Sequence, residues 1–189
     1  KEYPDGVKWV QLTRAGEFAQ ESNVMGHSVK GYDTLENGGR ASYGVGTGGW
    51  EAIKNGSAKV YSLRDKSGRS HVTIEVEDVG KIPKYLEGNE GKDISITQIK
   101  GKGNAKPADK YIPYVQDFVR GGKWEDVRDL QNTDLQITTD AKGKDIYVTD
   151  AEFENALRDS HGLPRGQRGS ADPRTLARVA AVAALAAGG

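Results

Sequence analysis

Hydrophobic and polar positions alternate most regularly along residues 60–76, VYSLRDKSGRSHVTIEV. The alternation places on one face Tyr61, Leu63, Val72, Ile74 and Val76. Between the two runs, DKSG supplies residue types that favour a tight turn. The pattern therefore predicts a β-hairpin in which Ser62 lies across from Thr73 and Arg64 lies across from His71.

Weaker patterns predict further elements on both sides of this hairpin. Strands are expected at residues 7–12, 93–101, 135–139 and 145–149, the last two as a second hairpin. Helices are expected at residues 15–26, 50–56, 108–122, 124–130 and 153–159. Residues 26–49 are too rich in glycine for a regular element, and Thr149 with Glu152 has the spacing of a helix capping box.

The C-terminal segment changes character. Residues 164–172 have the Pro, Gly and Arg content of a linker, and Asp172 with Pro173 is a good start for a helix. The Ala-rich apolar helix expected at 173–189 is shorter than the roughly 20 residues that a membrane span needs. It resembles the start of a further element in a longer chain.

Together the elements predict an α+β fold, a small antiparallel sheet with helices packed on one face, plus the C-terminal Ala-rich helix. The expected organisation is one domain at 1–163, the linker at 164–172 and the helix at 173–189. The first residues carry no apolar run typical of a secretory signal, and the chain does not begin with Met. We expect it to be a fragment of a larger protein.

Charge and composition narrow the chemistry. Lys and Arg together number 27, as do Asp and Glu, so the formal net charge is zero and only a local basic patch could bind nucleic acid. The absence of cysteine excludes disulfides, thiolate metal sites and a cysteine nucleophile. Three scattered histidines without cysteine argue against a zinc site, and we expect neither a metal nor a cofactor.

Four short motifs occur in a fixed order along the chain: MGHSVKGY (25–32), VYSLRD (60–65), HVTIEV (71–76) and ITQIKGKGN (96–104). Together they resemble the PcfJ-like domain, named for a conjugation-system protein, over roughly residues 9–120. The resemblance is carried by His27, by Ser62 and Arg64, by Thr73 and Glu75, and by Gln98, Gly101 and Asn104. Such domains have His-Cys-Val where this chain has Ser28 after the histidine, so a thiol nucleophile would be missing unless the serine replaced it.

The tail carries a second resemblance. Residues from Arg165 onward are similar to segments of very large phage polyvalent or internal virion proteins, in which an Arg/Gly linker leads into an apolar helix. Such proteins travel inside the capsid and are ejected with the DNA. The resemblance implies a virion location, in the capsid interior and then in the host cytoplasm or periplasm. It implies as partners other virion proteins or further parts of the same chain, with DNA as a candidate.

The polar face of the first hairpin has two interpretations. It carries Ser62, Arg64, His71, Thr73 and Glu75. These residue types are ordinary on the solvent side of an antiparallel sheet, where cross-strand pairs stabilise modestly. Alternatively, the face is a catalytic site with an acid–base pair, a guanidinium for an anion and an amide for orientation. In that case the catalytic residues are His27, Arg64, Glu75 and Gln98.

Two basic stretches are candidate contacts for phosphate or nucleic acid. A glycine-rich turn exposes backbone N–H groups, and this one carries Lys100, Lys102, Asn104 and Lys106. It lacks the spacing of a P-loop. The linker adds Arg165 and Arg168. Either stretch could equally be a solvated turn or linker.

Three functions follow from these observations. The first is a non-enzymatic domain of a phage virion or polyvalent protein that contacts nucleic acid or other virion proteins. The second is a PcfJ-like enzymatic domain acting on nucleic acid or nucleotide, and a conjugation accessory protein is a third reading. A convergent, partly buried cluster of the candidate side chains would favour the enzyme, whereas dispersed and exposed side chains would favour the virion domain.

Overall fold

The structure is a computed structural model that describes residues 1–27, 29, 49–78 and 94–162. The chain divides into two compact units, Lys1–Thr133 and Asp134–Gly189. The expected linker at 164–172 and the Ala-rich helix at 173–189 lie outside the described residues, as does most of the glycine-rich stretch at 26–49.

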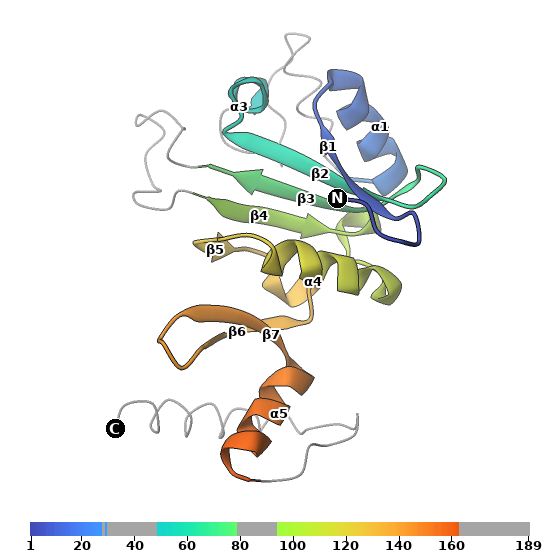
Figure 1. The fold of residues 1–189 in the computed structure, drawn as a ribbon. Coiled ribbons are helices and arrows are strands. Elements are labelled where there is room, and N and C mark those ends of the chain that lie inside the picture. Colours follow the sequence, from blue (N-terminus) through green and yellow to red (C-terminus); the bar gives the residue numbers. More distant parts are fainter. Residues whose placement is uncertain (28, 30–48, 79–93, 163–189) are drawn as a thin grey trace. The chain divides into compact units, whose positions relative to one another are not determined.

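A five-stranded sheet forms the centre of the first unit (Figure 1). Its strands, in spatial order, are β1 (Lys8–Leu12), β2 (Ala58–Arg64), β3 (Ser70–Glu77), β4 (Ser95–Lys100) and β5 (Asp126–Val127). The first four strands pair antiparallel, whereas β5 pairs parallel with β4. Among the described residues, the helices α1 (Ala15–Met25) and α3 (Gly49–Asn55) precede β2, and α4 (Ile112–Arg120) follows β4. The predicted α+β class is confirmed.

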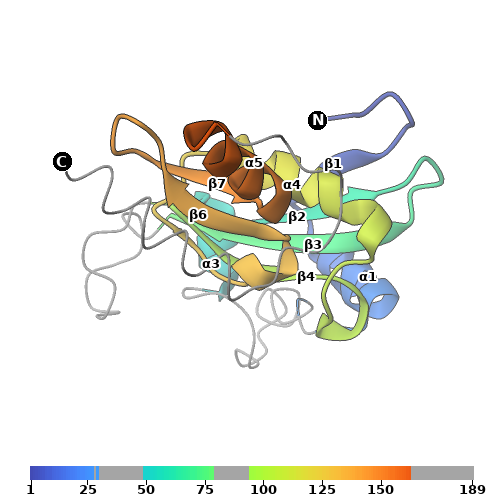
Figure 2. The same cartoon turned by 90° about the horizontal axis from the view of Figure 1, so that it is seen from below.

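Helices cover both faces of this sheet, where the sequence suggested one face (Figure 2). On one face, Phe18 of α1 packs in a buried cluster that includes Val60 of β2, and α3 covers the same cluster. On the other face, Phe118 of α4 lies with its ring centroid 4.9 Å from Trp9 and 5.3 Å from Tyr61. The two sides follow from alternation, because Val60 and Tyr61 are neighbours in one strand.

Helix α4 forms because its apolar residues recur at helical spacing. Ile112, Val115 and Val119 are buried on one stripe, and Pro113 stands in the first turn, where its missing N–H leaves no bond unmade. Before α4, a 3₁₀ turn (Asp109–Tyr111) leads into the helix. Tyr61, on the predicted apolar face of the hairpin, contacts α4 through the ring of Phe118.

A β-bulge changes the predicted register of the hairpin. Ser62 pairs with Thr73, as predicted, but the register shifts after Leu63 and Arg64 pairs with Ser70 instead of His71. The extra residue in β3 turns His71 off the polar face, where its ring stacks on Tyr111 at 4.3 Å between centroids. Ser70 takes its place on the polar face.

The short helix predicted at 124–130 is wrong. This segment forms β5 instead, because its backbone completes the free edge of β4: Glu125 N donates to Ile94 O and Arg128 N donates to Ile96 O. The chain then makes a 3₁₀ turn at Leu130–Asn132. Trp124 folds back onto α4 and stacks on Phe118, at 5.9 Å between ring centroids.

Side chains continue the pairing of β4 where β5 ends. Ile99 N donates to the Asp129 carboxylate at 3.1 Å, and Asn132 Nδ2 donates to Ile99 O at 2.8 Å. Asp129 has a positive φ of 58°, which turns its carboxylate back toward the strand. Both backbone groups of Ile99 therefore have partners without a further strand.

The second unit contains the predicted second hairpin, β6 (Leu135–Thr139) with β7 (Asp145–Thr149), and the helix α5 (Asp150–Ser160). The predicted capping box is confirmed: Glu152 N donates to Thr149 Oγ1 at 3.1 Å, and Thr149 N donates to the Glu152 carboxylate at 2.9 Å. Phe153 of α5 and Leu135 of β6 are buried. Among the described residues, no helix has the length and hydropathy to cross a membrane.

Candidate functional site

The polar face of the hairpin is buried rather than solvent-exposed. Helix α1 lies on it, so that Ser62 has 0% of its surface exposed, Glu75 4% and Thr73 7%. Thr73 and Glu75 point the same way because they are two residues apart in β3. Of the two interpretations, the wet side of a sheet is wrong for these three residues.

Pairing between β3 and β4 adds side chains to the same face. Glu75 lies across from Gln98, and Thr73 lies across from Lys100. A second register shift, after Glu75, places the extra residue Thr97 beside the Glu75 carboxylate, to which its hydroxyl donates at 2.8 Å.

His27 reaches this face from the end of α1. The helix stops at Gly26, whose positive φ of 69° reverses the chain, and the Gly26 N–H bonds to Ser22 O. The 3₁₀ turn Lys102–Asn104 that follows β4 lies against this point, since a Cβ built on Gly26 would be 3.7 Å from Gly103 N. The helix end and the turn thus place His27 and Asn104 at one end of the sheet.

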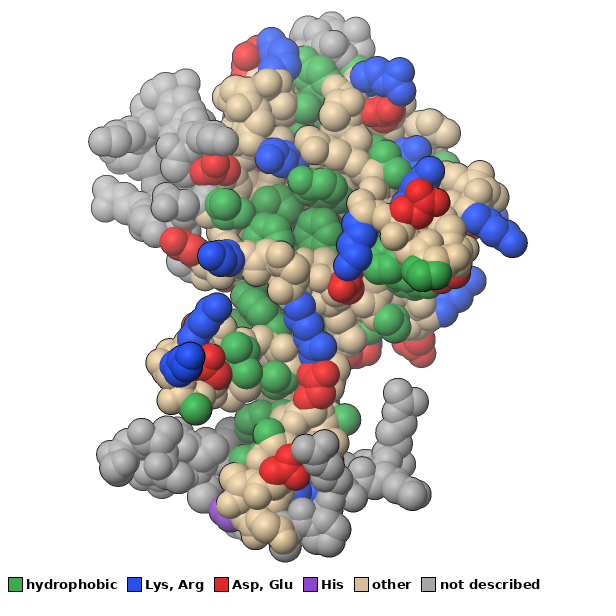
Figure 3. All heavy atoms as spheres, in the orientation of Figure 1, with side chains coloured by type: hydrophobic (Ala, Val, Ile, Leu, Met, Phe, Trp, Pro, Cys, Tyr) green, Lys and Arg blue, Asp and Glu red, His purple; other side chains and the backbone are tan. Residues whose placement is uncertain are grey.

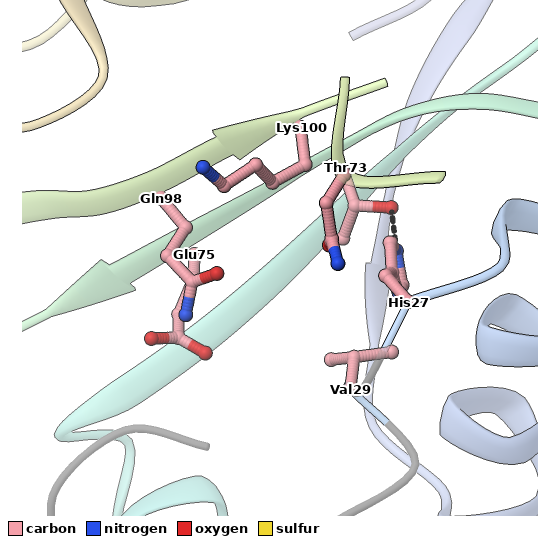
Figure 4. A pocket seen from close by; sticks show the side chains of 7 residues that line it. His27, Val29, Thr73, Glu75, Gln98 and Lys100 are labelled. Carbon is pink, nitrogen blue, oxygen red and sulfur yellow. Dashed lines mark hydrogen bonds between the residues drawn. The ribbon is translucent and has the colours of Figure 1, made fainter. Parts of the chain in front are cut away.

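These elements line a shallow pocket that is open to solvent, and the empty space in and above it is about 300 Å³. Its lining comprises His27, Val29, Thr73, Glu75, Gln98, Lys100 and Asn104. Figure 4 shows Gln98 beside Glu75 on the two strands, and His27 hydrogen-bonded to Thr73. The site is small, polar and built from three separate stretches of the chain.

The structure places the predicted catalytic residues unequally. His27, Glu75 and Gln98 line the pocket. Arg64 does not: its guanidinium Nε is 3.4 Å from Ser62 Oγ, and its Nη2 is 3.9 Å from a carboxylate oxygen of Glu21 on α1. The expected arginine therefore contacts a buried carboxylate instead of facing the pocket.

Of the residues predicted to contact phosphate, some line the pocket and others do not. Lys100 and Asn104 line the pocket, whereas Lys102 and Lys106 are exposed on the turn next to it. Lys100 also pairs with Asp129 at 2.9 Å, which offsets its charge. Arg165 and Arg168 lie outside the described residues.

The sequence did not single out Glu21, although it is central to this face. Its side chain has 0% exposure, and its carboxylate accepts hydrogen bonds from Ser70 Oγ at 2.6 Å and Thr73 Oγ1 at 2.7 Å. A signal was present in the sequence: Glu21 follows Phe18 by three residues and precedes Met25 by four, the spacing of one helix face, and the structure buries all three.

The protonation state of His27 follows from its surroundings. Its Nε2 lies 2.8 Å from Thr73 Oγ1. Burial lowers the pKa of the His27 ring from its ordinary value of 6.5, and the negative charge of Glu21 opposes part of that shift. We therefore expect a neutral imidazole at pH 7. Its Nδ1 is buried and has no hydrogen-bond partner among the described residues.

Charge elsewhere on the described surface is mixed. On the face shown in Figure 3, Lys and Arg side chains are interspersed with Asp and Glu. In the part of the chain that the structure describes, no three His, Asp or Glu side chains are grouped so that they could hold a metal ion.

Comparison of the chain with protein-family models, curated proteins and solved structures gives no match. The resemblance to PcfJ-like domains thus stays a prediction from the four motifs.

Proposed function

We propose that the first unit is an acid–base catalytic domain that acts on a nucleotide or on a nucleic-acid strand. The observation that supports this most is the convergence of His27, Glu75 and Gln98 on one pocket, together with Asn104. A merely solvated sheet face would not be covered by a helix or bring a loop histidine onto the strands. The proposal takes the enzymatic reading of the sequence over the non-enzymatic one.

His27 is the proton acceptor in this proposal. A neutral imidazole holds a lone pair on the nitrogen that carries no proton, and burial keeps His27 neutral near pH 7. A buried acceptor without a donor costs about 1–3 kcal/mol. Because Nδ1 is buried in this conformation, a substrate hydroxyl or water must displace its neighbours to donate to it. That contact would remove the cost, and the proton would pass to Nδ1 during the reaction.

The remaining side chains suit a polar, uncharged moiety such as a base or a ribose. Gln98 and Asn104 each offer an amide donor and acceptor, and the Glu75 carboxylate accepts. The pocket itself has little surplus positive charge, because Lys100 is paired with Asp129. The substrate phosphate is therefore assigned to Lys102, which is exposed on the turn beside the pocket.

The test is turnover of a defined panel: mononucleotides, short single-stranded DNA and short RNA, with products separated by chromatography. His27→Gln is expected to reduce the rate about 10²- to 10⁴-fold, the usual contribution of a positioned base. His71→Gln is the matched control, because His71 stacks on Tyr111 and bonds to Asp65 outside the pocket. It should retain the wild-type rate.

Two results would overturn the proposal. One is a wild-type protein that neither binds nor turns over any member of the panel. The other is activity that survives His27→Gln unchanged. Glu75→Gln separates binding from catalysis, because loss of an interaction that is equally strong in the ground state and the transition state raises KM while kcat stays the same.

The wider setting remains a proposal that rests on the tail and on the four motifs. In it, the parent protein is packaged in a phage virion, is ejected with the DNA and contacts nucleic acid or other virion proteins. Peptides from this chain in purified phage particles would support that setting. Their absence from particles, with the protein found only in infected or conjugating cells, would favour the conjugation reading.

A further inference from the structure

A carboxylate is completely buried between α1 and the sheet. Glu21 has 0% exposure, and each of its two oxygens accepts one hydroxyl: Oε2 from Ser70 and Oε1 from Thr73. Both distances, 2.6 and 2.7 Å, are typical of hydrogen bonds to an ionised carboxylate. An ionised carboxylate, which can only accept hydrogen bonds, suits these two hydroxyl donors.

The compensating charge comes from Arg64 in β2. Its Nη2 lies 3.9 Å from Glu21 Oε2, and its Nε donates to Ser62 Oγ at 3.4 Å. Ser62 Oγ in turn donates to Ser70 Oγ at 3.1 Å. Burying an ion without a partner is strongly unfavourable, so the guanidinium and the hydroxyls together make an ionised Glu21 tolerable here.

The direction of the hydrogen bonds determines the tautomer of His27. Thr73 has one hydroxyl proton, which it donates to Glu21. Its oxygen can then only accept from His27 Nε2, which lies 2.8 Å away. Nε2 therefore carries the proton, and in the neutral ring Nδ1 is left with the lone pair.

We infer that Glu21 is a positioning residue for His27, acting through the Thr73 hydroxyl, and that Arg64 is the charge partner of Glu21. The inference rests on the proposed function of His27 as proton acceptor. It assigns to Arg64 a role different from binding a substrate anion. When His27 takes up a proton at Nδ1, the charge that forms lies one hydroxyl away from the Glu21 carboxylate.

Several charged groups surround the His27 ring. Glu21 lies on α1, Glu75 on β3 and Lys100 on β4, and Arg64 stands behind Glu21. Among the described residues, a chain of hydrogen bonds runs from the Glu21 carboxylate through the Thr73 hydroxyl to the ring. Since the negative charge of Glu21 raises the pKa of His27 against the effect of burial, removing that charge should lower this pKa further.

The experiment measures His27 directly by ¹⁵N NMR, in parallel with the rate of turnover. Thr73→Val removes the bridging hydroxyl with almost no change in shape, and Thr73→Ser restores it. Glu21→Gln removes the charge. Thr97→Val is the matched control, because it removes a hydroxyl from the same sheet that bonds to Glu75 and not to His27.

The expected results form a pattern. Thr73→Val and Glu21→Gln lower the pKa of His27, hasten exchange of its Nε2 proton and reduce turnover about 10- to 100-fold. Thr73→Ser behaves like the wild type, and Thr97→Val leaves the titration of His27 unchanged. The double variant Thr73→Val with Glu21→Gln is no slower than the slower of these two single variants, because both changes act through the same hydrogen-bonded connection.

Failure of the inference and failure of the proposed function give different results. If His27 titrates identically in Thr73→Val, Glu21→Gln and wild type, the connection is wrong, even where His27→Gln abolishes activity. If His27 responds as expected but the wild-type protein has no activity, the hydrogen-bonded chain stands and its catalytic role is wrong. If Glu21→Gln does not fold, the comparison of Thr73→Val with Thr73→Ser still tests the connection.

Discussion

Thr73 and Ile74 are neighbours in β3, yet they belong to two different environments. Ile74 is completely buried on the face that α4 covers. Thr73 is almost as deeply buried on the opposite face, but its neighbours there are Glu21 and His27. Burial is thus nearly equal on the two faces while the chemistry differs. A buried apolar face stabilises the fold directly, whereas a buried polar face is retained at some cost to stability and is a candidate for function.

The sharpest test of this comparison replaces each of the two neighbours in a separate variant. Ile74→Ala should lower the free energy of unfolding by about 2–5 kcal/mol, because it leaves a cavity in a packed core. Thr73→Val should cost less, about 1–3 kcal/mol, since it removes hydrogen bonds while keeping the volume. Urea unfolding followed by tryptophan fluorescence measures both.

The titration of His27 should respond in the opposite order. It should change in Thr73→Val and stay as in the wild type in Ile74→Ala. A larger loss of stability in Thr73→Val than in Ile74→Ala, or a changed titration in Ile74→Ala, would contradict this comparison of the two faces.

The glycine turn beside the pocket allows a second, smaller test. A Cβ on Gly101 would lie 2.8 Å from the Cα of Pro107 and 2.9 Å from the carbonyl oxygen of Lys106, whereas a Cβ on Gly103 meets open space. Gly101→Ala should therefore force the backbone to shift and cost about 1–3 kcal/mol. Gly103→Ala should cost about 1–2 kcal/mol through its positive φ of 62°.

The two glycine variants should differ most in the pocket. Gly101→Ala should move Asn104 and weaken nucleotide binding, measured by calorimetry, whereas Gly103→Ala should bind nearly as the wild type does. The reverse order of affinities would place the ligand contacts on Gly103 and contradict the pocket described above.

The smallest expected effect is a difference in pH dependence. Below about pH 6.5 the unfolded chain binds a proton at His27 that the folded chain resists, because the pKa of the buried ring is lowered. Stability should therefore fall on acidification through this window more steeply in the wild type than in His27→Gln. The difference between the two unfolding midpoints at pH 7 and pH 5 measures the effect, and the carboxylates common to both proteins cancel. Parallel curves would mean that His27 is not desolvated.

Alternation and turn chemistry were enough to predict most of the fold. The two hairpins, α4 with its early Pro113 and the capping box at Thr149 all depend on residues close in sequence, where local physics dominates. The segment around Trp124 was misread as a helix because its pairing partner, the edge of β4, lies about thirty residues away. Nothing local distinguishes a two-residue strand from a short helical turn.

The site was predictable only in part, for a related reason. His27, Glu75 and Gln98 were named from the sequence, since each stands in a motif. Which residues face the pocket depends on two register shifts, after Leu63 and after Glu75, and a bulge leaves no clear mark in a pattern of period two. For Arg64 the deciding contact is Glu21, and that contact requires knowing that α1 covers the hairpin.

The side-chain hydrogen bonds to the backbone of Ile99 in β4 have a consequence for self-association. An exposed strand edge is a template on which another chain can add a strand, the first step toward aggregation. Here the carboxylate of Asp129 and the amide of Asn132 occupy the two backbone groups that a foreign strand would need at Ile99. Replacing both residues by alanine would leave the N–H and C=O of Ile99 without these partners. The pair should therefore protect this strand edge from pairing with another copy of the chain, in addition to stabilising the fold.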